Sequence, residues 1–154
     1  MALIEQKLKE LDIKLDQFDR KGKGVLRTRR YKDLLFISAH GPYDTFGIPL
    51  ATGKVGTQIT GEEGYAAGRL TAISMLETIK DAIGDLDRID YFVKGMVLFN
   101  SGGTFYDMPK YANGFSDLIV ALYGARGRHA RAAMGCGTHS DNVPIKVEML
   151  VKLR

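Results

Sequence analysis

In the segment from Gly127 to Gly135, Arg131 stands at the start of a stretch of small apolar residues. A guanidinium keeps its charge at any working pH and offers a rigid fork of N–H donors, so on a strand edge it suits a planar carboxylate or phosphate. The competing interpretation is a surface salt bridge, which accounts for most arginines. His129 stands two residues earlier and would share the face of Arg131 on a strand. The segment therefore indicates a position that could bind an anion.

One further side chain, His40, is a candidate for chemistry. His40 stands just before Gly41 and Pro42, and an unperturbed imidazole titrates near neutrality, so it could act as an acid or base. Hydrogen bonding of this histidine to the backbone is the alternative. The three histidines lack a paired metal-ligand spacing and Cys136 has no cysteine partner, so the sequence predicts no metal site. A single cysteine also excludes an intrachain disulfide and favours a reducing, cytoplasmic setting.

The composition is that of an ordinary soluble protein with a mild positive charge. At 154 residues, one domain spanning 1–154 is the natural expectation, and no stretch approaches the roughly 20 apolar residues of a membrane span. The formal net charge is +4, with basic residues crowded at 20–32 and 126–131. Such clusters could hold phosphates or an acidic small molecule, although a solvated basic face is the commoner explanation. Without Trp or an RNA-stacking motif, nucleic acid is not the expected partner.

Three segments have the pattern of helices. The clearest covers about 61–83, where Thr60 and Glu63 make a capping box and Gly84 supplies the stop. A second covers about 108–123, and a short amphipathic pattern at 3–11 places one or two turns in an N-terminal extension, residues 1–20. For the first helix the expected apolar stripe is Tyr65, Ala66, Leu70, Ile73, Leu76, Ile79, Ala82 and Ile83, with Glu62, Arg69, Glu77, Lys80 and Asp81 outside.

Five segments have the pattern of strands, namely 25–30, 34–38, 89–100, 130–136 and 145–153. Apolar and polar residues alternate in the last, which is clear strand periodicity. The segment 89–100 is rich in β-branched and aromatic residues on both sides, which predicts a central strand covered on both faces. The resulting order is ββαβαββ. Helices separated by strand pairs predict an α+β fold, with a mixed sheet on one side and two helices on the other.

Several motifs in this order resemble the Rid family, which is also called YjgF-like or endoribonuclease L-PSP-like. They are the run 84–89 after the capped helix, the strand 91–94, the helix with Asn113, the Ala130 and Arg131 strand, and the final Val147 and Glu148. The resemblance covers roughly residues 20–154. It implies a chorismate mutase-like α+β fold, assembled as a homotrimer with sites in the clefts between subunits. It also implies hydrolysis of reactive enamines and imines of amino acids to a 2-keto acid and ammonia, with no metal or organic cofactor.

The resemblance also implies roles for individual residues. Arg131 matches the invariant arginine of the family and would hold the substrate carboxylate as a bidentate partner. The family positions that help to hold substrate match Ser38, Ala39 and Ala133. Asn113 matches a position near the helix and the cleft, where simple helix packing is an equal alternative.

The chain departs from the family pattern where the deaminases hold water. Lys146 stands in place of a carboxylate, and a protonated lysine cannot accept a proton from water. Val25 replaces a tyrosine, and Glu148 matches a glutamate that is structural in the family. The catalytic candidates are therefore His40 and Lys146.

Three functions remain open. The first is a Rid-like hydrolytic deaminase of small reactive imine and enamine acids. The second is a noncatalytic binder of small carboxylate metabolites, which the extra positive charge at Lys146 would suit. The third is RNA binding or ribonuclease activity, for which the basic segment 20–32 is the sequence support.

Overall fold

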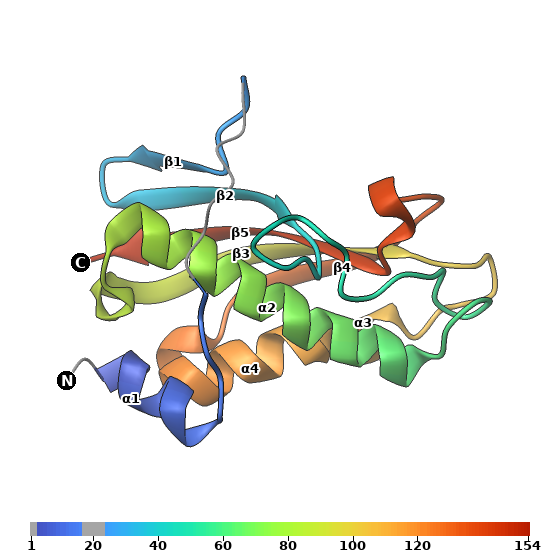
Figure 1. Cartoon of the computed structure of the whole chain (residues 1–154), viewed down its shortest axis with the longest axis horizontal. Coiled ribbons are helices and arrows are strands. Elements are labelled where there is room, and N and C mark those ends of the chain that lie inside the picture. The colour runs from blue at the N-terminus through green and yellow to red at the C-terminus, as the bar shows by residue number, and fades with distance from the viewer. Residues whose placement is uncertain (1–2, 17–23) are drawn as a thin grey trace.

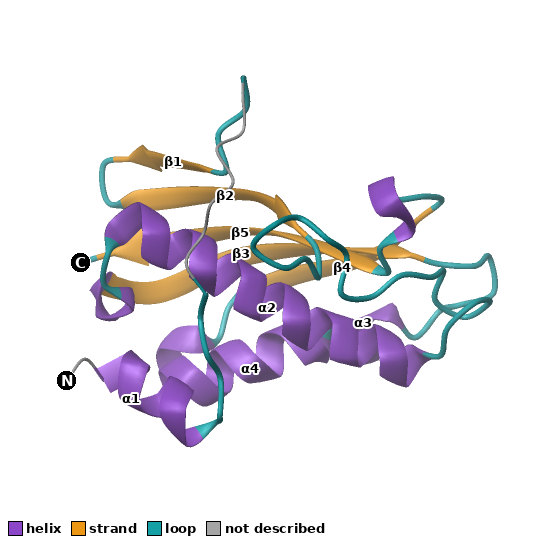
Figure 2. Cartoon of the chain, viewed as in Figure 1, coloured by secondary structure: helices purple, strands orange, loops and turns teal. Residues whose placement is uncertain are grey.

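The computed structural model describes residues 3–16 and 24–154 as a five-stranded sheet with helices packed against one face (Figures 1 and 2). The predicted α+β class and the order ββαβαββ are confirmed, with two helices, α3 and α4, where one was expected. None of the described helices is long and apolar enough to cross a membrane. In chain order the helices and strands are α1 (Leu3–Glu10), β1 (Thr28–Tyr31), β2 (Leu34–His40), α2 (Gly61–Ile83), β3 (Ile89–Asn100), α3 (Met108–Tyr111), α4 (Asn113–Tyr123), β4 (Ala130–Cys136) and β5 (Ile145–Leu153).

The strand β5 lies at the centre of the sheet, whose order is β1-β2-β5-β3-β4. Both neighbours, β2 and β3, run antiparallel to β5, and β4 joins the edge parallel to β3. The register pairs Gly95 with Arg131 on β4, and Leu98 with Lys146 on β5. Side chains alternate along a strand, so Arg131 faces the helices with Gly95, whereas Lys146 and Leu98 face the other way.

No described helix covers the face of the sheet that carries Lys146, which we call the open face. There the side chains of Phe36, Lys94 and Glu148 are exposed, and a hollow of about 470 Å³ lies among them. The prediction that the segment 89–100 is covered on both faces is therefore wrong for the single chain. All of the described helices pack on one side, so the apolar residues on the second side of β3 remain partly exposed.

The helix α2 begins and ends where its sequence signals predicted. The Thr60 hydroxyl accepts the N–H of Glu63 at 3.1 Å, and the Glu63 carboxylate accepts the N–H of Thr60 at 2.7 Å. At the other end Gly84 adopts φ of 78° and its N–H donates to the Lys80 carbonyl at 2.7 Å. A positive φ suits glycine because no Cβ meets the backbone.

Small residues allow α2 and α4 to approach each other closely where they cross. A Cβ added to Gly114 would lie 1.9 Å from the carbonyl oxygen of Tyr65, and one added to Gly68 would lie 3.0 Å from the nitrogen of Phe115. The two backbones therefore approach each other closely along this crossing. The predicted stripe is wrong at three positions, because Tyr65, Ala66 and Ala82 are exposed.

Glu77 was expected on the outside of α2 but is buried. Its Oε1 accepts the backbone N–H of Asp16 at 3.2 Å, so the chain after α1 passes over this part of α2. Burial raises the pKa of Glu77 above its ordinary value. The sequence pattern missed this because the covering segment lies 61 residues away along the chain.

The helix predicted at 108–123 is divided at Ala112 into α3 and α4. In a continuous helix the carbonyl of Pro109 would accept the N–H of Asn113. Here that carbonyl accepts a hydrogen bond from the guanidinium of Arg131 at 2.8 Å. The interruption of the helix thus coincides with the attachment of Arg131.

The helix expected at 3–11 is confirmed as α1, and it forms part of the core. Ile4 and Leu8 are buried. The ammonium of Lys7 donates to the carbonyl of Leu122 at 2.8 Å, which fixes α1 to the end of α4. Figure 1 shows α1 beside this end of α4.

The first strand begins three residues later than predicted, at Thr28 rather than Val25. Its pairing with β2 is confirmed as antiparallel. Lys32 takes φ of 55° in the tight turn between the two strands. The expected basic segment 20–32 lies partly outside the described residues, as do positions 17–20 of the N-terminal extension.

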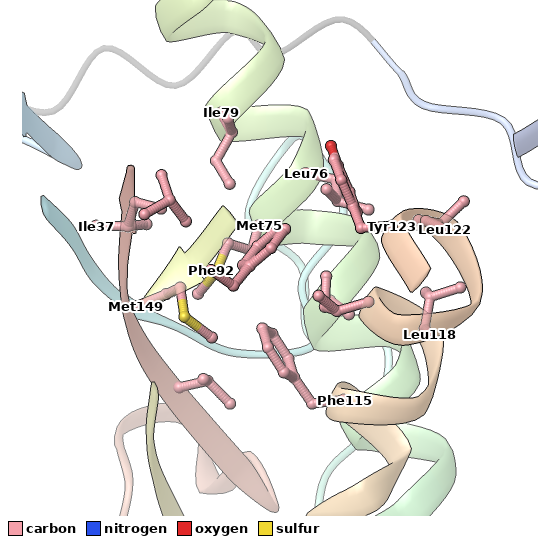
Figure 3. Close-up of a cluster of buried hydrophobic side chains, with 14 of the residues drawn as sticks. Ile37, Met75, Leu76, Ile79, Phe92, Phe115, Leu118, Leu122, Tyr123 and Met149 are labelled. Carbon is pink, nitrogen blue, oxygen red and sulfur yellow. The ribbon is translucent and has the colours of Figure 1, made fainter. Parts of the chain in front are cut away.

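The main hydrophobic core fills the space between the sheet and the helices (Figure 3). Met149 and Phe92 enter it from the sheet, and Phe115 enters it from α4. The ring of Phe92 packs edge-on against that of Tyr123, with centroids 4.9 Å apart. This core holds α4 against β3 and β4, and so fixes the helix opposite Arg131.

Candidate functional site

Three neutral oxygen acceptors hold the guanidinium of Arg131 between β4 and the start of α4. Its Nη1 donates to Asn113 Oδ1 and to Ser116 Oγ, each at 2.9 Å, and its Nη2 donates to the Pro109 carbonyl at 2.8 Å. Asn113 and Ser116 lie on the same side of α4 because residues three apart on a helix are neighbours. The arginine is therefore oriented by the helix before any ligand binds.

The charge of Arg131 is not neutralised by its direct partners. Within residues 3–16 and 24–154, no carboxylate forms an ion pair with it, which argues against the salt-bridge interpretation. The three hydrogen bonds occupy three of the five guanidinium N–H groups, and neither Nε–H nor the second Nη2–H has an acceptor in the described part of the chain. Burial lowers the pKa of Arg131, but a guanidinium stays charged at neutral pH. Two donors on a cation remain for a ligand.

A hollow of about 330 Å³ opens beside Arg131 at the surface, and its lining residues are Ser116, Val120, Arg128, His129 and Arg131. Its two arginines make the hollow electropositive. Val120 supplies an apolar side wall from α4. A small organic anion with a short apolar group would match this lining.

Ser116 joins Arg131 to His129. The Oγ atom of Ser116 lies 3.1 Å from His129 Nε2, while His129 Nδ1 lies 2.8 Å from the carbonyl oxygen of Gly127. Arg131 and His129 thus reach the same hydroxyl, which agrees with the expectation that they share a face of the strand. Burial holds the pKa of His129 below its ordinary value, and the charge of Arg131 acts in the same direction, against the Gly127 carbonyl.

The absence of a side chain at Gly95 makes room for His129. A Cβ at Gly95 would lie 3.4 Å from Cδ2 of the imidazole and 2.9 Å from the Met149 methyl carbon. On the other side the ring of Phe115 meets the imidazole edge-on, with centroids 6.3 Å apart. The ring of His129 is therefore held between β3 and α4.

The structure brings two of the predicted binding residues, Arg131 and Asn113, into direct contact. Ala133 lies two residues further along β4, half-buried and on the same face as Arg131. These three residues form one part of the predicted site.

The other predicted binding residues lie apart from Arg131 within the single chain. Ser38 lines the hollow on the open face, and Ala39 is exposed at an irregularity in the pairing of β2 with β5. Lys146 also belongs to the open face, where its ammonium donates to Ser140 Oγ at 2.6 Å. Glu148 is exposed on the same face of β5.

His40 is buried at the end of β2, on the helix side of the sheet. Its Nδ1 lies 2.6 Å from the Ser38 carbonyl and its Nε2 lies 2.8 Å from Thr78 Oγ1 on α2. The carbonyl can only accept, so Nδ1 carries the proton and the Thr78 hydroxyl donates to Nε2. This arrangement favours a structural role for His40, the alternative that the sequence left open.

Ser116 was missed by the sequence reasoning, although it joins the two strongest candidates. Its signal was the three-residue spacing from Asn113, which places both side chains on one side of a helix. The spacing indicates a site only once β4, which brings Arg131 to this side of the helix, is known to face it. Cys136 Sγ and His139 Nε2 lie 2.8 Å apart at the far end of β4, outside the hollow beside Arg131.

Comparison with known proteins agrees with this architecture. The family described as "YjgF/chorismate mutase-like, putative endoribonuclease" matches residues 32–153. The chain is 40% identical over 120 residues to Protein TCP17 of Trypanosoma cruzi, which covers 77% of this chain and 74% of that protein. A protein of unknown function from Agrobacterium tumefaciens, Atu1372, has a crystal structure that is similar with a TM-score of 0.89 and 30% identity, over 98% of this chain and 92% of that one.

A second crystal structure, of a protein from Shewanella oneidensis MR-1 described as a putative endoribonuclease, has a TM-score of 0.91 and 26% identity, over 99% of this chain and 100% of that one. The sheet order and the helix layer of the present structure are those expected for the chorismate mutase-like fold. With the family match extending over most of its length, the chain belongs to the YjgF family, also known as the Rid family.

Proposed function

We propose that this protein binds small reactive imine or enamine acids through Arg131 and hydrolyses them to a 2-keto acid and ammonia. The observation that carries the proposal is the guanidinium held by three neutral acceptors, with two N–H groups left for a ligand. A carboxylate offers two coplanar oxygens, which match two such donors. The reaction uses no metal or organic cofactor in this proposal.

In this reaction the protein acts mainly by orienting the substrate and one water molecule. An imine carbon is already electrophilic, so a water molecule held beside it can add to it once a base takes a proton. The C–N bond then breaks, the nitrogen leaves as ammonia with the transferred protons, and the carbon becomes the carbonyl of the 2-keto acid. Arg131 contributes by fixing the carboxylate next to this carbon.

We further propose that the chain assembles as a homotrimer whose subunits complete one another's sites. The support is the open face, where Phe36 and Tyr91 are 47% and 44% exposed. Large apolar side chains exposed on one face of a sheet are typical of a protein interface. Light scattering should give three times the chain mass, and Phe36→Glu should reduce that mass because it buries a charge at the contact.

The hydrolase proposal is tested by timing pyruvate release from enzymatically generated 2-aminoacrylate. The wild-type protein should accelerate release over buffer, and Arg131→Ala should lose most of that acceleration. Arg154→Ala, which removes an arginine beyond the end of β5, is the matched control and should behave as wild type. Equal rates with and without the wild-type protein would exclude this activity.

Binding is measured separately by calorimetry with pyruvate. A sheltered charge-assisted pair contributes about 1.5–3 kcal/mol, so Arg131→Ala should weaken pyruvate binding by roughly ten- to 150-fold. Affinity that is indifferent to Arg131→Ala would remove the anchor from the proposal.

The second candidate function is a noncatalytic binder of small carboxylates. The observation that favours it is Lys146, an amine where the deaminases have a carboxylate, and its ammonium already donates to Ser140. Pyruvate binding that depends on Arg131, combined with no acceleration of 2-aminoacrylate hydrolysis, would establish this second function in place of the first.

A further inference from the structure

We propose that Ser116 and His129 form the acid–base pair of this site. In this inference, which rests on the proposed hydrolase function, His129 takes a proton from the attacking water through the Ser116 hydroxyl. It later returns that proton to the departing nitrogen. The pair would supply the function for which the chain has no carboxylate at position 146.

The hydrogen-bond partners determine the direction of each bond. The Gly127 carbonyl can only accept, so the proton of neutral His129 is on Nδ1, 2.8 Å from that oxygen. The lone pair is then on Nε2, 3.1 Å from Ser116 Oγ, and the hydroxyl must donate to it. A hydroxyl that donates to an imidazole is the arrangement of a serine paired with a general base.

The second partner of Ser116, Arg131, polarises the hydroxyl further. Arg131 Nη1 donates to the same oxygen at 2.9 Å. A cationic donor stabilises negative charge on oxygen, so it favours transfer of the hydroxyl proton to His129. The oxygen can then take a proton from water. Arg131 thereby links the anchored carboxylate to the acid–base pair.

Burial and the charge of Arg131 lower the pKa of His129, which disfavours its protonated form, and the imidazole lines a hollow on one side. The charged groups on the elements around it are Arg131 on β4, Asp117 on α4 and Arg128 in the preceding loop, while β3 presents Gly95. Both Ser116 and His129 line the hollow of about 330 Å³, which is the side from which a ligand can enter.

The proposed step balances in atoms and charge. Water forms a bond to the protonated imine carbon, its proton passes to Ser116 Oγ, and the Ser116 proton passes to His129 Nε2. The reverse relay then delivers the proton to the amine nitrogen, ammonia departs, and the carbonyl forms as the remaining hydroxyl loses its proton to solvent. Both side chains end in their starting state.

The deciding experiment compares His129→Gln with His139→Gln in the full chain. Gln at 129 can still hydrogen-bond to Ser116 but does not titrate, and His139 is a histidine outside the Arg131 hollow. We expect His129→Gln to lower kcat for 2-aminoacrylate hydrolysis about a hundredfold or more. Pyruvate affinity should stay within a few-fold of wild type, and His139→Gln should leave both unchanged.

The pH dependence of kcat distinguishes an acid–base role of His129 from a purely structural role. The base must be neutral, so the wild-type kcat should fall on the acid side with a midpoint below the ordinary pKa of histidine, the direction in which burial moves His129. His129→Gln should lose this acid limb. An unchanged kcat and acid limb in His129→Gln would overturn the acid–base pair while leaving the hydrolase function standing.

Ser116 provides a second variant pair. Ser116→Ala should lower kcat as His129→Gln does, and Ser116→Thr, which keeps the hydroxyl, should restore most of it. Thermal unfolding of each variant shows whether a lower kcat comes from loss of the fold or from loss of proton transfer through Ser116. If the wild-type protein binds pyruvate without hydrolysing 2-aminoacrylate, both the acid–base pair and the hydrolase function fail, and only the carboxylate anchor remains.

Discussion

Asn113 Oδ1 accepts a hydrogen bond of 2.9 Å from Arg131 Nη1, so the first residue of α4 touches the cation of the candidate site. An amide oxygen orients the guanidinium without removing its charge. A carboxylate in the same place would form an ion pair instead, and the remaining donors of Arg131 would attract a ligand less strongly. Because Asn113 carries no charge, the positive charge of Arg131 remains available to attract an anionic ligand.

The variant Asn113→Asp tests this point, since it changes charge with little change in shape. We expect pyruvate affinity to fall about tenfold or more, because the new carboxylate competes with the ligand for Arg131. Calorimetry at constant ionic strength provides the measurement. Asn113→Ala removes the acceptor and adds no charge, so it should weaken binding less. An Asn113→Asp protein that binds pyruvate as tightly as wild type would show that this charge balance is unimportant.

A methyl group at Gly114 should destabilise the fold. Its Cβ would lie 1.9 Å from the Tyr65 carbonyl oxygen, and both atoms belong to the backbones of packed helices, so neither can move alone. We expect Gly114→Ala to lower the free energy of unfolding by about 1–3 kcal/mol or more, measured by urea denaturation. Gly137→Ala is the matched control, because a Cβ there has no neighbour within 4 Å. Equal losses from both variants would contradict the close crossing of α2 and α4.

The burial of Glu77 should make stability depend on pH. Its pKa is raised in the folded state, mainly by burial, so the folded protein holds this proton more tightly than the unfolded chain does. The stability from this group is therefore present below the unfolded pKa, near 4, and is lost as pH rises through the folded pKa. Glu77→Gln does not titrate, and its stability relative to wild type should increase between pH 4 and pH 7.

Thermal unfolding across this pH range provides the measurement for Glu77→Gln. Glu62→Gln is the control. Glu62 is exposed in the first turn of the same helix, where the helix dipole favours a negative charge. This control variant should gain no stability at neutral pH. A flat difference between wild type and Glu77→Gln would mean that Glu77 is solvated in both states.

The helix α1 should contribute to the stability of the whole domain. Ile4 is 0% exposed whereas its neighbour Leu3 is 51% exposed. Ile4→Ala should cost about 2–5 kcal/mol, as expected for truncating a buried aliphatic side chain, and Leu3→Ala should cost far less. Both are measured by denaturant unfolding. Similar small losses would indicate that α1 detaches from the core in solution.

The sequence predicted the elements of this fold better than the packing between them. The capping box at Thr60 and Glu63 and the stop at Gly84 are local signals, and the helix they delimit has the predicted bounds. The buried face of that helix depends on Gly114 of another helix and on Asp16, so hydrophobic periodicity alone placed Tyr65 inside and Glu77 outside. Such contacts are set by tertiary structure rather than by residue type.

The candidate site was predictable only in part for the same reason. Arg131 has a recognisable sequence context, and Asn113 matched a family position. Ser116 becomes a candidate only through its distances to residues 13 and 15 positions away. The separation of Lys146 from Arg131 required the strand register, since alternation assigns each to a face only after Gly95 and Leu98 are paired with them.

The central position of β5 has a consequence for how the chain folds during synthesis. β2 and β3 are joined in the sheet only through β5, the last strand in chain order. Until the ribosome has released Ile145–Leu153, the earlier strands form two separate ribbons with unpaired edges. A nascent chain stopped before this strand therefore has two incomplete half-sheets, which makes it a substrate for chaperones and proteases rather than a smaller working domain.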